Sequence, residues 1–255
     1  SVNYGADKYM DIIERDIFSV ICRNDGIKAK SIAKEIGKER SVVNHYLYRS
    51  AFIKDLCYRD DNYMWHGLIR QTRPHTGLSD YCGYHGNVAD FIKMPYDEWF
   101  EYMKSGCMGI GRNLNNTRGL FHSFSDTHDV MVNLFSDLDC IDYSGWEIVF
   151  ELRIKKSKHI RIYADVLVIT DFYVFSFEFK MNDKILDEDV LQAAKYNEYL
   201  EVLFGPEYEV ISALVLTRAE DLYTYVPVGR TTAEIAVCSG DMLFNVFNEY
   251  LGFFQ

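Results

Sequence analysis

Residues 172–200 read FYVFSFEFKMNDKILDEDVLQAAKYNEYL, and they give the clearest indication of this chain's architecture. It opens as a run of aromatic and β-branched residues, which is the composition of a buried strand. Glu178 and Lys180 stand at the end of that run, two residues apart. Because side chains alternate along a strand, we expect these two charges to share one face and the alternating phenylalanines to hold the other.

The pattern on either side of this stretch predicts helices packed on a mixed sheet, which is an α/β domain. The expected elements are a helix over 125–138, strands over 146–154, 160–170 and 172–180, a helix over 187–204, a strand over 209–217, a last strand over 233–238 and a last helix over 241–253.

A second carboxylate stands on the strand that precedes the quoted one. If strands 160–170 and 172–180 pair as a hairpin, Asp165 lies next to Glu178. Buried carboxylates cost several kcal/mol each unless they are paired, so these must meet a cation or a metal ion. Hard oxygen ligands suit Mg²⁺, and this set with Lys180 indicates metal-assisted hydrolysis of a phosphodiester, in which Lys180 orients or deprotonates the attacking water.

Together, Asp165, Glu178-x-Lys180 and Gln192-x-x-x-Tyr196 resemble the motifs of the PD-(D/E)XK nuclease superfamily, in its RecB-like branch. The resemblance implies a restriction-endonuclease-like mixed sheet flanked by helices. It implies that Asp165 and Glu178 hold Mg²⁺ or Mn²⁺ and that Lys180 is catalytic. It also implies that Gln192 and Tyr196 complete the catalytic set by contacting the substrate strand near the scissile phosphate.

The same resemblance implies one more metal ligand on the family's first helix. Asp129 is the candidate in this chain, with His128 and His122 as competitors, because the common Glu is missing there. The proline that often precedes the Asp is replaced by Ala164. In the family, the residue after the Glu, here Phe179, often lends a backbone carbonyl to the metal.

The first expected strand carries Glu147 and Glu151, and either could face the site or be an ordinary ion-paired strand residue. The turn after it, RIKKSKHIR at 153–161, is basic. It is either a solvated hairpin tip or a turn that binds phosphates outside the acidic centre. Its candidate nucleic-acid contacts are Lys155, Lys156 and Lys158.

Near the N-terminus, three expected helices over 8–24, 28–36 and 39–52 precede a β-pair that turns at Asp60-Asp61-Asn62. This order predicts a winged helix-turn-helix. Steps of four place Arg40, Asn44 and Tyr48 on one face of the third helix, and the hairpin presents Trp65.

This quartet resembles the Zα family of winged helices, which implies phosphate contacts by the basic residue and Asn, and a Trp that supports the Tyr. The wing reads DDNYMW and lacks the family's prolines. A generic winged helix, and one that contacts only proteins, remain as alternatives.

These patterns predict three regions: a nucleic-acid-binding winged helix over 1–71, a linker with small helical content over 72–118, and a nuclease domain over 119–255. Charge divides along the chain, because residues 1–75 hold 13 basic and 10 acidic side chains while the remainder holds 14 and 28. The net charge of −11 therefore lies in the second part. A carboxylate-rich half can still bind a polyanion if metal ions lie between the carboxylates and the polyanion.

The six cysteines are scattered and form no CxxC pair, which is typical of buried apolar thiols in a reducing compartment. No apolar run is long enough to span a bilayer, and the first residues lack a signal-peptide pattern. We therefore expect a location inside the cell, in the cytoplasm, nucleoid or nucleus, with no membrane partner and no secretion.

The function expected from these features is a Mg²⁺- or Mn²⁺-dependent nuclease. DNA is favoured over RNA as its substrate, in antiviral defence or DNA repair, and the winged helix binds the substrate or a structured duplex such as the Z form. A homodimer or larger complex is an open expectation. Two alternatives are a non-catalytic nucleic-acid-binding regulator and a complex subunit that uses the nuclease-like fold as a scaffold.

Overall fold

The computed structural model describes residues 11–24, 26–67, 77–112, 114, 117–138, 141–156 and 161–252. The chain divides into two compact units, and each is described by itself. The N-terminal unit consists of Ser1–Gly77, Ile154–Ile162 and Glu198–Pro206. The sheet unit consists of Leu78–Arg153, Tyr163–Asn197 and Glu207–Gln255.

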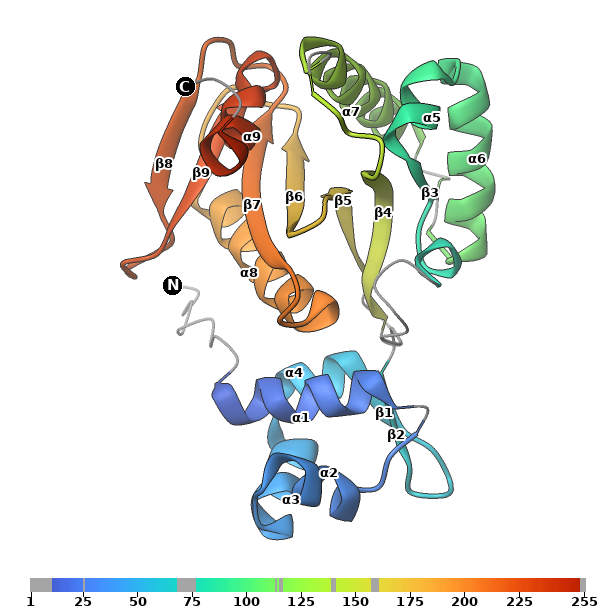
Figure 1. The fold of residues 1–255 in the computed structure, drawn as a ribbon, viewed down its shortest axis with the longest axis vertical. Coiled ribbons are helices and arrows are strands. Elements are labelled where there is room, and N and C mark those ends of the chain that lie inside the picture. The colour runs from blue at the N-terminus through green and yellow to red at the C-terminus, as the bar shows by residue number, and fades with distance from the viewer. Residues whose placement is uncertain are drawn as a thin grey trace. The chain divides into compact units, whose positions relative to one another are not determined.

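The N-terminal unit has the predicted order of helices followed by a β-hairpin (Figure 1). Its elements are α1 (Ile12–Arg23), α2 (Ala29–Ile36), α3 (Arg40–Arg49), α4 (Ala51–Leu56), β1 (Cys57–Arg59) and β2 (Trp65–Gly67). Apolar residues of the helices form a buried centre that includes Ile17, Ile21, Ile32, Val43 and Leu47. The hairpin turns where predicted, and Asp60 Oδ1 fixes the turn by accepting the N–H groups of Asn62 and Met64, each at 2.9 Å.

The third helix expected over 39–52 is two helices instead of one. Ser50 lies between them with extended backbone, and its hydroxyl accepts the N–H of Ile53 at 3.2 Å. A serine that accepts this hydrogen bond is a helix N-cap, so α4 starts afresh after α3 ends. The apolar spacing alone did not reveal this break, because α3 and α4 both place apolar residues in the same buried centre.

The sheet unit is built on a mixed sheet of seven strands among the described residues, in the order β3-β4-β5-β6-β7-β9-β8 (Figure 1). The strands are β3 (Tyr84–Asn87), β4 (Glu147–Lys156), β5 (Arg161–Ile169), β6 (Tyr173–Lys180), β7 (Glu209–Leu216), β8 (Tyr223–Pro227) and β9 (Glu234–Ser239). Strand β6 pairs antiparallel with β5 and parallel with β7. The predicted α/β class with a mixed sheet flanked by helices is therefore confirmed.

Helices cover both faces of this sheet. They are α5 (Val88–Lys93), α6 (Tyr96–Gly109), α7 (Thr117–Asp137), α8 (Asp187–Phe204) and α9 (Phe244–Leu251), with short 3₁₀ turns at Leu78–Asp80 and Gly240–Met242. Phe175 and Phe177 of β6 pack with residues of α6, α7 and α9, including Phe247. A second cluster joins Val190 and Ala193 of α8 to β7 and β9. Strand β6 is thus buried from both sides, with its aromatics on the face away from α8.

Within 72–118, the described residues from Leu78 onward belong to the sheet unit and not to the predicted linker. Strand β3 is an edge strand of the main sheet and pairs with β4 in the register Tyr84↔Phe150. Helix α6 contributes Trp99 and Met103 to the main core. The predicted boundary at 118 is therefore wrong, because YHGN hides a strand in residues typical of turns. Strand β8 was also missed. It lies at the other edge of the sheet, where it pairs with β9.

Two glycines bring α6 unusually close to the sheet. A Cβ placed on Gly106 would lie 2.0 Å from the carbonyl oxygen of Gly83, which is a backbone atom that cannot rotate away. Any side chain at 106 would therefore force α6 off the strand region. The contact between Gly106 and Gly83 therefore fixes the position of the C-terminal end of α6 and of the residues that follow it.

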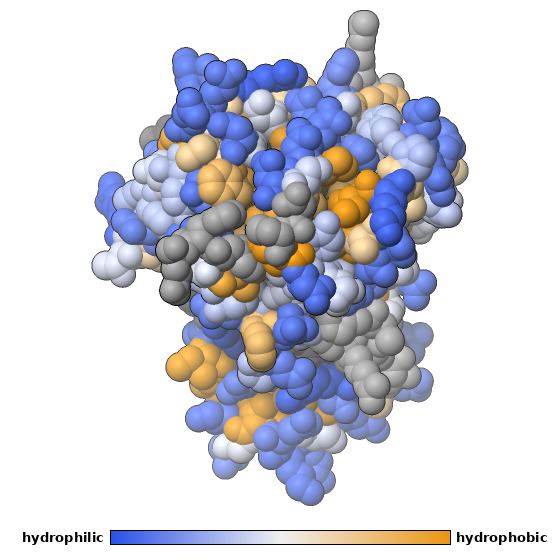
Figure 2. All heavy atoms as spheres, turned by 45° about the horizontal axis from the view of Figure 1, so that its top comes forward, coloured by the Kyte–Doolittle hydropathy of each residue, from blue (hydrophilic) through white to orange (hydrophobic). Residues whose placement is uncertain are grey.

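The surface of the molecule is mainly hydrophilic in the view of Figure 2, with smaller apolar areas between charged side chains. Within the described residues no helix is both long and apolar enough to cross a membrane. The five cysteines at 22, 57, 82, 107 and 238 are buried free thiols, as predicted, and Cys140 lies outside the described residues.

Candidate functional site

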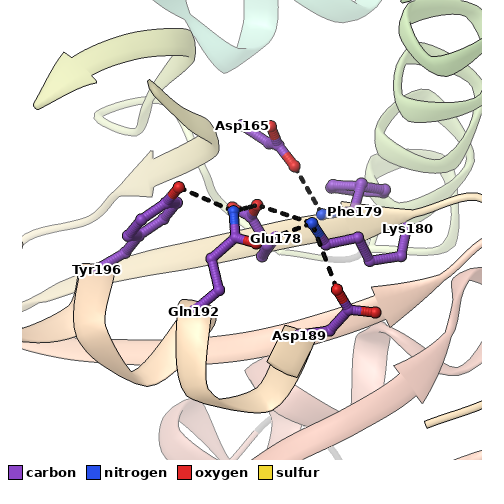
Figure 3. Close-up of polar contacts among 7 residues, drawn as sticks. All are labelled: Asp165, Glu178, Phe179, Lys180, Asp189, Gln192 and Tyr196. Carbon is purple, nitrogen blue, oxygen red and sulfur yellow. Dashed lines mark hydrogen bonds and ion pairs between the residues drawn. The ribbon is translucent and has the colours of Figure 1, made fainter. Parts of the chain in front are cut away.

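Strands β5 and β6 bring the two predicted carboxylates together. Their antiparallel ladder runs from Ile169↔Val174 to Val166↔Phe177, so Asp165 and Glu178 follow as the next opposed positions. There Asp165 Oδ2 accepts the N–H of Phe179 at 2.8 Å (Figure 3). The hairpin predicted from the sequence is therefore present, and a side-chain carboxylate ties the two strands where the ladder ends.

Gln192 of α8 links the other three predicted residues. Its Nε2 donates to Glu178 Oε1 at 2.9 Å and to the hydroxyl of Tyr196 at 2.8 Å. Its Oε1 accepts from Lys180 Nζ at 3.0 Å. Figure 3 shows these side chains converging between the strand and the helix. The spacing of four residues places Gln192 and Tyr196 on one face of α8, and that face lies over the charged end of β6.

Asp189 is a member of this group that the sequence reasoning missed. It lies three residues before Gln192 on α8 and its Oδ1 is 3.5 Å from Lys180 Nζ. Lys180 is also 3.7 Å from Glu178 Oε1. The helical step of three could have pointed to Asp189. Lys180 is thus held by two carboxylates and one amide.

A third buried carboxylate, Glu151 of β4, belongs to the same group of charges. It is 5 % exposed, and its Oε2 lies 2.7 Å from Arg112 Nε. Burial and the charge of Asp165 raise the pKa of Glu178, and the charge of Glu151 adds to that rise. Glu147, the other candidate on this strand, pairs with His85 at 2.7 Å. Of the two open candidates, Glu151 is the one that belongs to the site.

Burial and mutual repulsion set the electrostatics of these carboxylates. Burial raises the pKa of Glu151 to about 8, and the charge of Asp165 adds to the shift. Burial, with the repulsion of Asp165 next, raises the pKa of Glu178 well above its usual range. The pKa of Asp165 is also raised by burial, while the N–H of Phe179 and the cations Lys180 and Arg112 oppose that rise. Three acids that resist ionisation together are a group that a cation would stabilise.

The donor chemistry fits a hard divalent cation. Asp165 and Glu178 supply carboxylate oxygens, the ligands that Mg²⁺ and Mn²⁺ prefer. Within the described residues, however, no three His, Cys, Asp or Glu side chains stand in a ready arrangement for a metal ion. Lys180 and Arg112 provide the compensating charge in this arrangement. A metal would therefore use Asp165 and Glu178 in exchange for some of these ion pairs.

The candidates for an additional ligand on the family's first helix lie elsewhere. Asp129 of α7 has a side chain that is 70 % exposed, and its ion-pair partner is His128 at 3.7 Å. His128 is buried against Tyr96 and Trp99, and burial lowers its pKa. His122 is exposed. No contact found in the described part of the chain joins any of these three to Asp165 or Glu178.

The basic turn at 153–161, predicted as a candidate phosphate-binding segment, is described only in part. Lys158 lies outside the described residues, and the side chains of Lys155 and Lys156 do as well, although their backbone belongs to β4. Arg153 packs over the ring of Tyr81 and donates to the carbonyl of Ile110 at 2.8 Å. This arginine is therefore engaged inside the sheet unit.

On the N-terminal unit, Tyr48 and Trp65 meet as predicted. Their rings form an edge contact with centroids 5.6 Å apart, and Trp65 is buried while Tyr48 is 47 % exposed. Arg40 is exposed on the same helix, and Asn44 is half-buried.

Arg59 of β1 was not predicted, yet it completes this surface. Its Nη1 donates to the hydroxyl of Tyr48 at 2.8 Å. Its guanidinium also lies 4.9 Å from the ring centre of Tyr63, which is 67 % exposed. Exposed rings beside a guanidinium are a surface on which bases and phosphates can bind.

Comparisons with known proteins give no family for this chain. No family model and no curated protein matches it. Among solved structures, protein VC1899 from Vibrio cholerae matches with a TM-score of 0.29 and 12% identity, over 94% of this chain and 50% of that protein. The chain thus spans about half the length of that protein, and a similarity this low carries no argument about fold or function.

Proposed function

We propose that this protein is a metal-dependent nuclease that hydrolyses phosphodiester bonds, with DNA as the favoured substrate. The observation that carries the proposal is the convergence of Asp165, Glu178 and Lys180 at one end of β6, organised by Gln192. Two acids that favour a cation, beside a lysine that can serve an attacking water, match the needs of this chemistry.

Each side chain has a role in the proposed reaction. Asp165 and Glu178 would hold Mg²⁺ or Mn²⁺, which supplies a Lewis acid for the phosphoryl oxygen. Lys180, held by Gln192 and Asp189, places its ammonium where it can orient the water or neutralise charge on the phosphate. Tyr196 fixes the other side of Gln192 through its hydroxyl. In this arrangement Gln192 positions the catalytic groups, in addition to any contact that it makes with the substrate strand.

The N-terminal unit is proposed to bind the nucleic acid, as a winged helix does. Tyr48 and Arg59 present an aromatic and cationic surface on the unit whose sequence carries the basic balance. Binding of a left-handed duplex is the finer form of this proposal, and it rests on the face shared by Arg40, Asn44 and Tyr48. Antiviral defence and DNA repair are both settings for such an enzyme.

The direct test is a cleavage assay on linear, circular and single-stranded DNA and on RNA, with Mg²⁺, Mn²⁺ or EDTA. Wild type should cut in the presence of metal and not in EDTA. Glu178→Ala and Lys180→Ala should lose that activity, while Glu188→Gln, on the exposed first turn of α8, is the matched control. Equal cutting by wild type and both site variants would show that the site is assigned wrongly.

A non-catalytic regulator is the second candidate, and one observation favours it. The described carboxylates form no ready metal arrangement, and Glu178 already accepts a hydrogen bond from Gln192. This candidate predicts nucleic-acid binding by the N-terminal unit with no cutting in any metal. The same assay, run beside a binding measurement, separates the two.

A further inference from the structure

On β4 the structure brings together a partly exposed arginine, Arg112, and a carboxylate whose residue, Glu151, has a strained backbone. Glu151 has a backbone φ of 55°, in the left-handed region that residues with a side chain rarely adopt. The distortion is visible in the ladder, because the N–H of Gly83 is shared between the carbonyls of Phe150 at 2.9 Å and Glu151 at 3.3 Å. Such strain persists where the surroundings enforce it, and it gathers at functional sites.

The end of α6 delivers the arginine to this carboxylate. The contact of Gly106 with Gly83 fixes the helix against the strand region, and the N–H of Arg112 donates to the carbonyl of Cys107 at 2.9 Å just beyond the helix end. Arg112 then lies over the ring of Tyr163, 4.4 Å from its centre, with Nε 2.7 Å from Glu151 Oε2. Elements far apart in the sequence therefore cooperate to place one guanidinium next to Glu151.

The Arg112–Glu151 pair is close but incompletely bonded. The two atoms at 2.7 Å are both buried, and neither has a hydrogen-bond partner of good geometry. The Arg112 side chain as a whole keeps 25% of its surface exposed. Burial raises the pKa of Asp165, and the charge of Arg112 is among the influences that oppose this rise. A guanidinium has five donors in a planar fork, so it can hold Glu151 and still offer donors to a phosphate.

We propose that Arg112 is a phosphate-binding residue of the nuclease site and that Glu151 is the positioning residue that aims it. The inference rests on the proposed function and names the substrate group that the site takes, which is a phosphodiester held from the β4 side. Lys180, which pairs with Glu178 and Asp189, serves the β6 side. The alternative is an ion pair that only joins α6 to the sheet.

The test compares variants in which Glu151 is already neutral. Removal of Arg112 alone would leave the buried carboxyl group of Glu151 without its cation partner, which would itself change stability. The variant E151Q keeps Arg112, and R112Q/E151Q removes it without leaving an orphan carboxylate. Lys104→Gln, which removes a surface cation of α6 paired with Glu101, is the control for lost charge.

The measurement is binding of the best-cleaved nucleic acid at several salt concentrations, with Ca²⁺ in place of Mg²⁺ and uncut substrate verified. Relative to E151Q, R112Q/E151Q should bind about tenfold more weakly or worse. The slope of log affinity against log salt should be about one unit shallower, because one phosphate contact is lost. In the cleavage assay, KM should rise in the double variant, while K104Q should match wild type.

The outcomes separate the two proposals. If R112Q/E151Q keeps the salt slope and KM of E151Q while wild type cuts DNA, the pair is structural and this inference is wrong, but the nuclease proposal stands. If wild type cuts nothing in any metal, the proposed function is wrong and this inference falls with it. A lower unfolding temperature with an unchanged salt slope also counts against Arg112 as a phosphate ligand.

Discussion

Gln192 lies 2.9 Å from Glu178 through its amide nitrogen, while its amide oxygen faces Lys180. One uncharged side chain therefore donates a hydrogen bond to a glutamate and accepts one from a lysine. Its orientation is set by the two partners, since the nitrogen must face the carboxylate and the oxygen the ammonium. This relationship makes the geometry of the site depend on α8.

Loss of either charged group on β6 should abolish cutting with little loss of fold. Glu178→Gln keeps the size of the side chain and removes its charge, and Lys180→Met keeps the apolar stem. Each should lower kcat by about 10²–10⁴-fold, the scale of a general acid–base or electrostatic contribution. Steady-state cleavage beside circular dichroism checks this, and retention of more than a tenth of wild-type kcat by both variants would contradict it.

Gln192 should be more sensitive than Tyr196. Gln192→Leu removes the contacts to both Glu178 and Lys180 at once, and we expect kcat to fall about 10–100-fold with a smaller change in KM. Tyr196→Phe removes only the hydroxyl that accepts from Gln192, so a severalfold loss is expected, in line with about 1 kcal/mol for one hydrogen bond. Parallel kinetics of the two variants test the order, and a larger loss in Tyr196→Phe would refute it.

The stability of the metal-free protein should fall as pH rises. Folding raises the pKa of Glu151 to about 8, from an ordinary carboxyl value of about 4.3 in the unfolded chain. The folded state then binds more protons than the unfolded state between those values. The free energy of unfolding should therefore decrease from about pH 4.5 to pH 8 through this group.

Thermal unfolding in EDTA across that pH range measures the effect. Glu151→Gln should flatten the dependence, because its amide does not titrate. The single variant leaves Arg112 without its carboxylate partner, so the slope is the quantity to compare and not the absolute midpoint. A wild-type midpoint that rises steadily from pH 5 to pH 8 would be inconsistent with the prediction.

Divalent cations should stabilise the protein through Asp165 and Glu178. A ligand that binds only the folded state adds about 2.7 kcal/mol at a hundredfold excess over Kd. We expect a higher unfolding midpoint with Mg²⁺ or Mn²⁺ than in EDTA. The double variant Asp165→Asn/Glu178→Gln should lose this gain, whereas Asp129→Asn should keep it, since Asp129 is exposed on α7. An equal gain in all three proteins would place the cation elsewhere.

The N-terminal surface should bind nucleic acid through Tyr48 and Arg59. Tyr48→Ala removes a ring for stacking, worth about 1–3 kcal/mol per base, and Arg59→Ala also frees the hydroxyl of Tyr48. Affinity should drop in both, while Arg49→Ala, an exposed arginine at the end of α3, serves as the charge-matched control.

Circular dichroism of alternating CG duplexes tests the finer proposal. An inverted spectrum at saturation that is lost in Asn44→Ala/Tyr48→Ala would support Z-form binding. If the duplex binds tightly and its circular dichroism spectrum does not invert, the unit binds duplexes without preference for the Z form.

Local patterns predicted the central part of the fold well. Alternation on β6 and the hairpin to β5 are properties of neighbouring residues, and they placed Asp165, Glu178 and Lys180 in one group. The resemblance to a nuclease superfamily added Gln192 and Tyr196 to that group. Strand β3 was missed because an edge strand needs little apolar alternation. Residue spacing also could not show that Glu151 faces the site, since its left-handed backbone interrupts the alternation of β4.

Tertiary pairing accounts for the remaining differences. Arg112 reaches Glu151 only because α6 lies against Gly83, a contact between segments with no shared pattern. Asp129 fitted the helical position implied by the resemblance, but the rotation of α7 leaves its side chain exposed. Helix rotation depends on the packed core and cannot be read from the spacing of one ligand.

The five residues grouped around Gln192 come from one continuous segment, Asp165 to Tyr196, whereas Arg112 and Glu151 join from earlier parts of the chain. Contacts between near neighbours in sequence close small loops and form early in folding, while distant ones wait for the loop to be closed. The chain should therefore acquire its acid–lysine–amide group before the arginine arrives. During refolding, binding of a phosphate-rich probe should appear later than secondary structure does. That delay would measure how slowly α6 packs against the sheet.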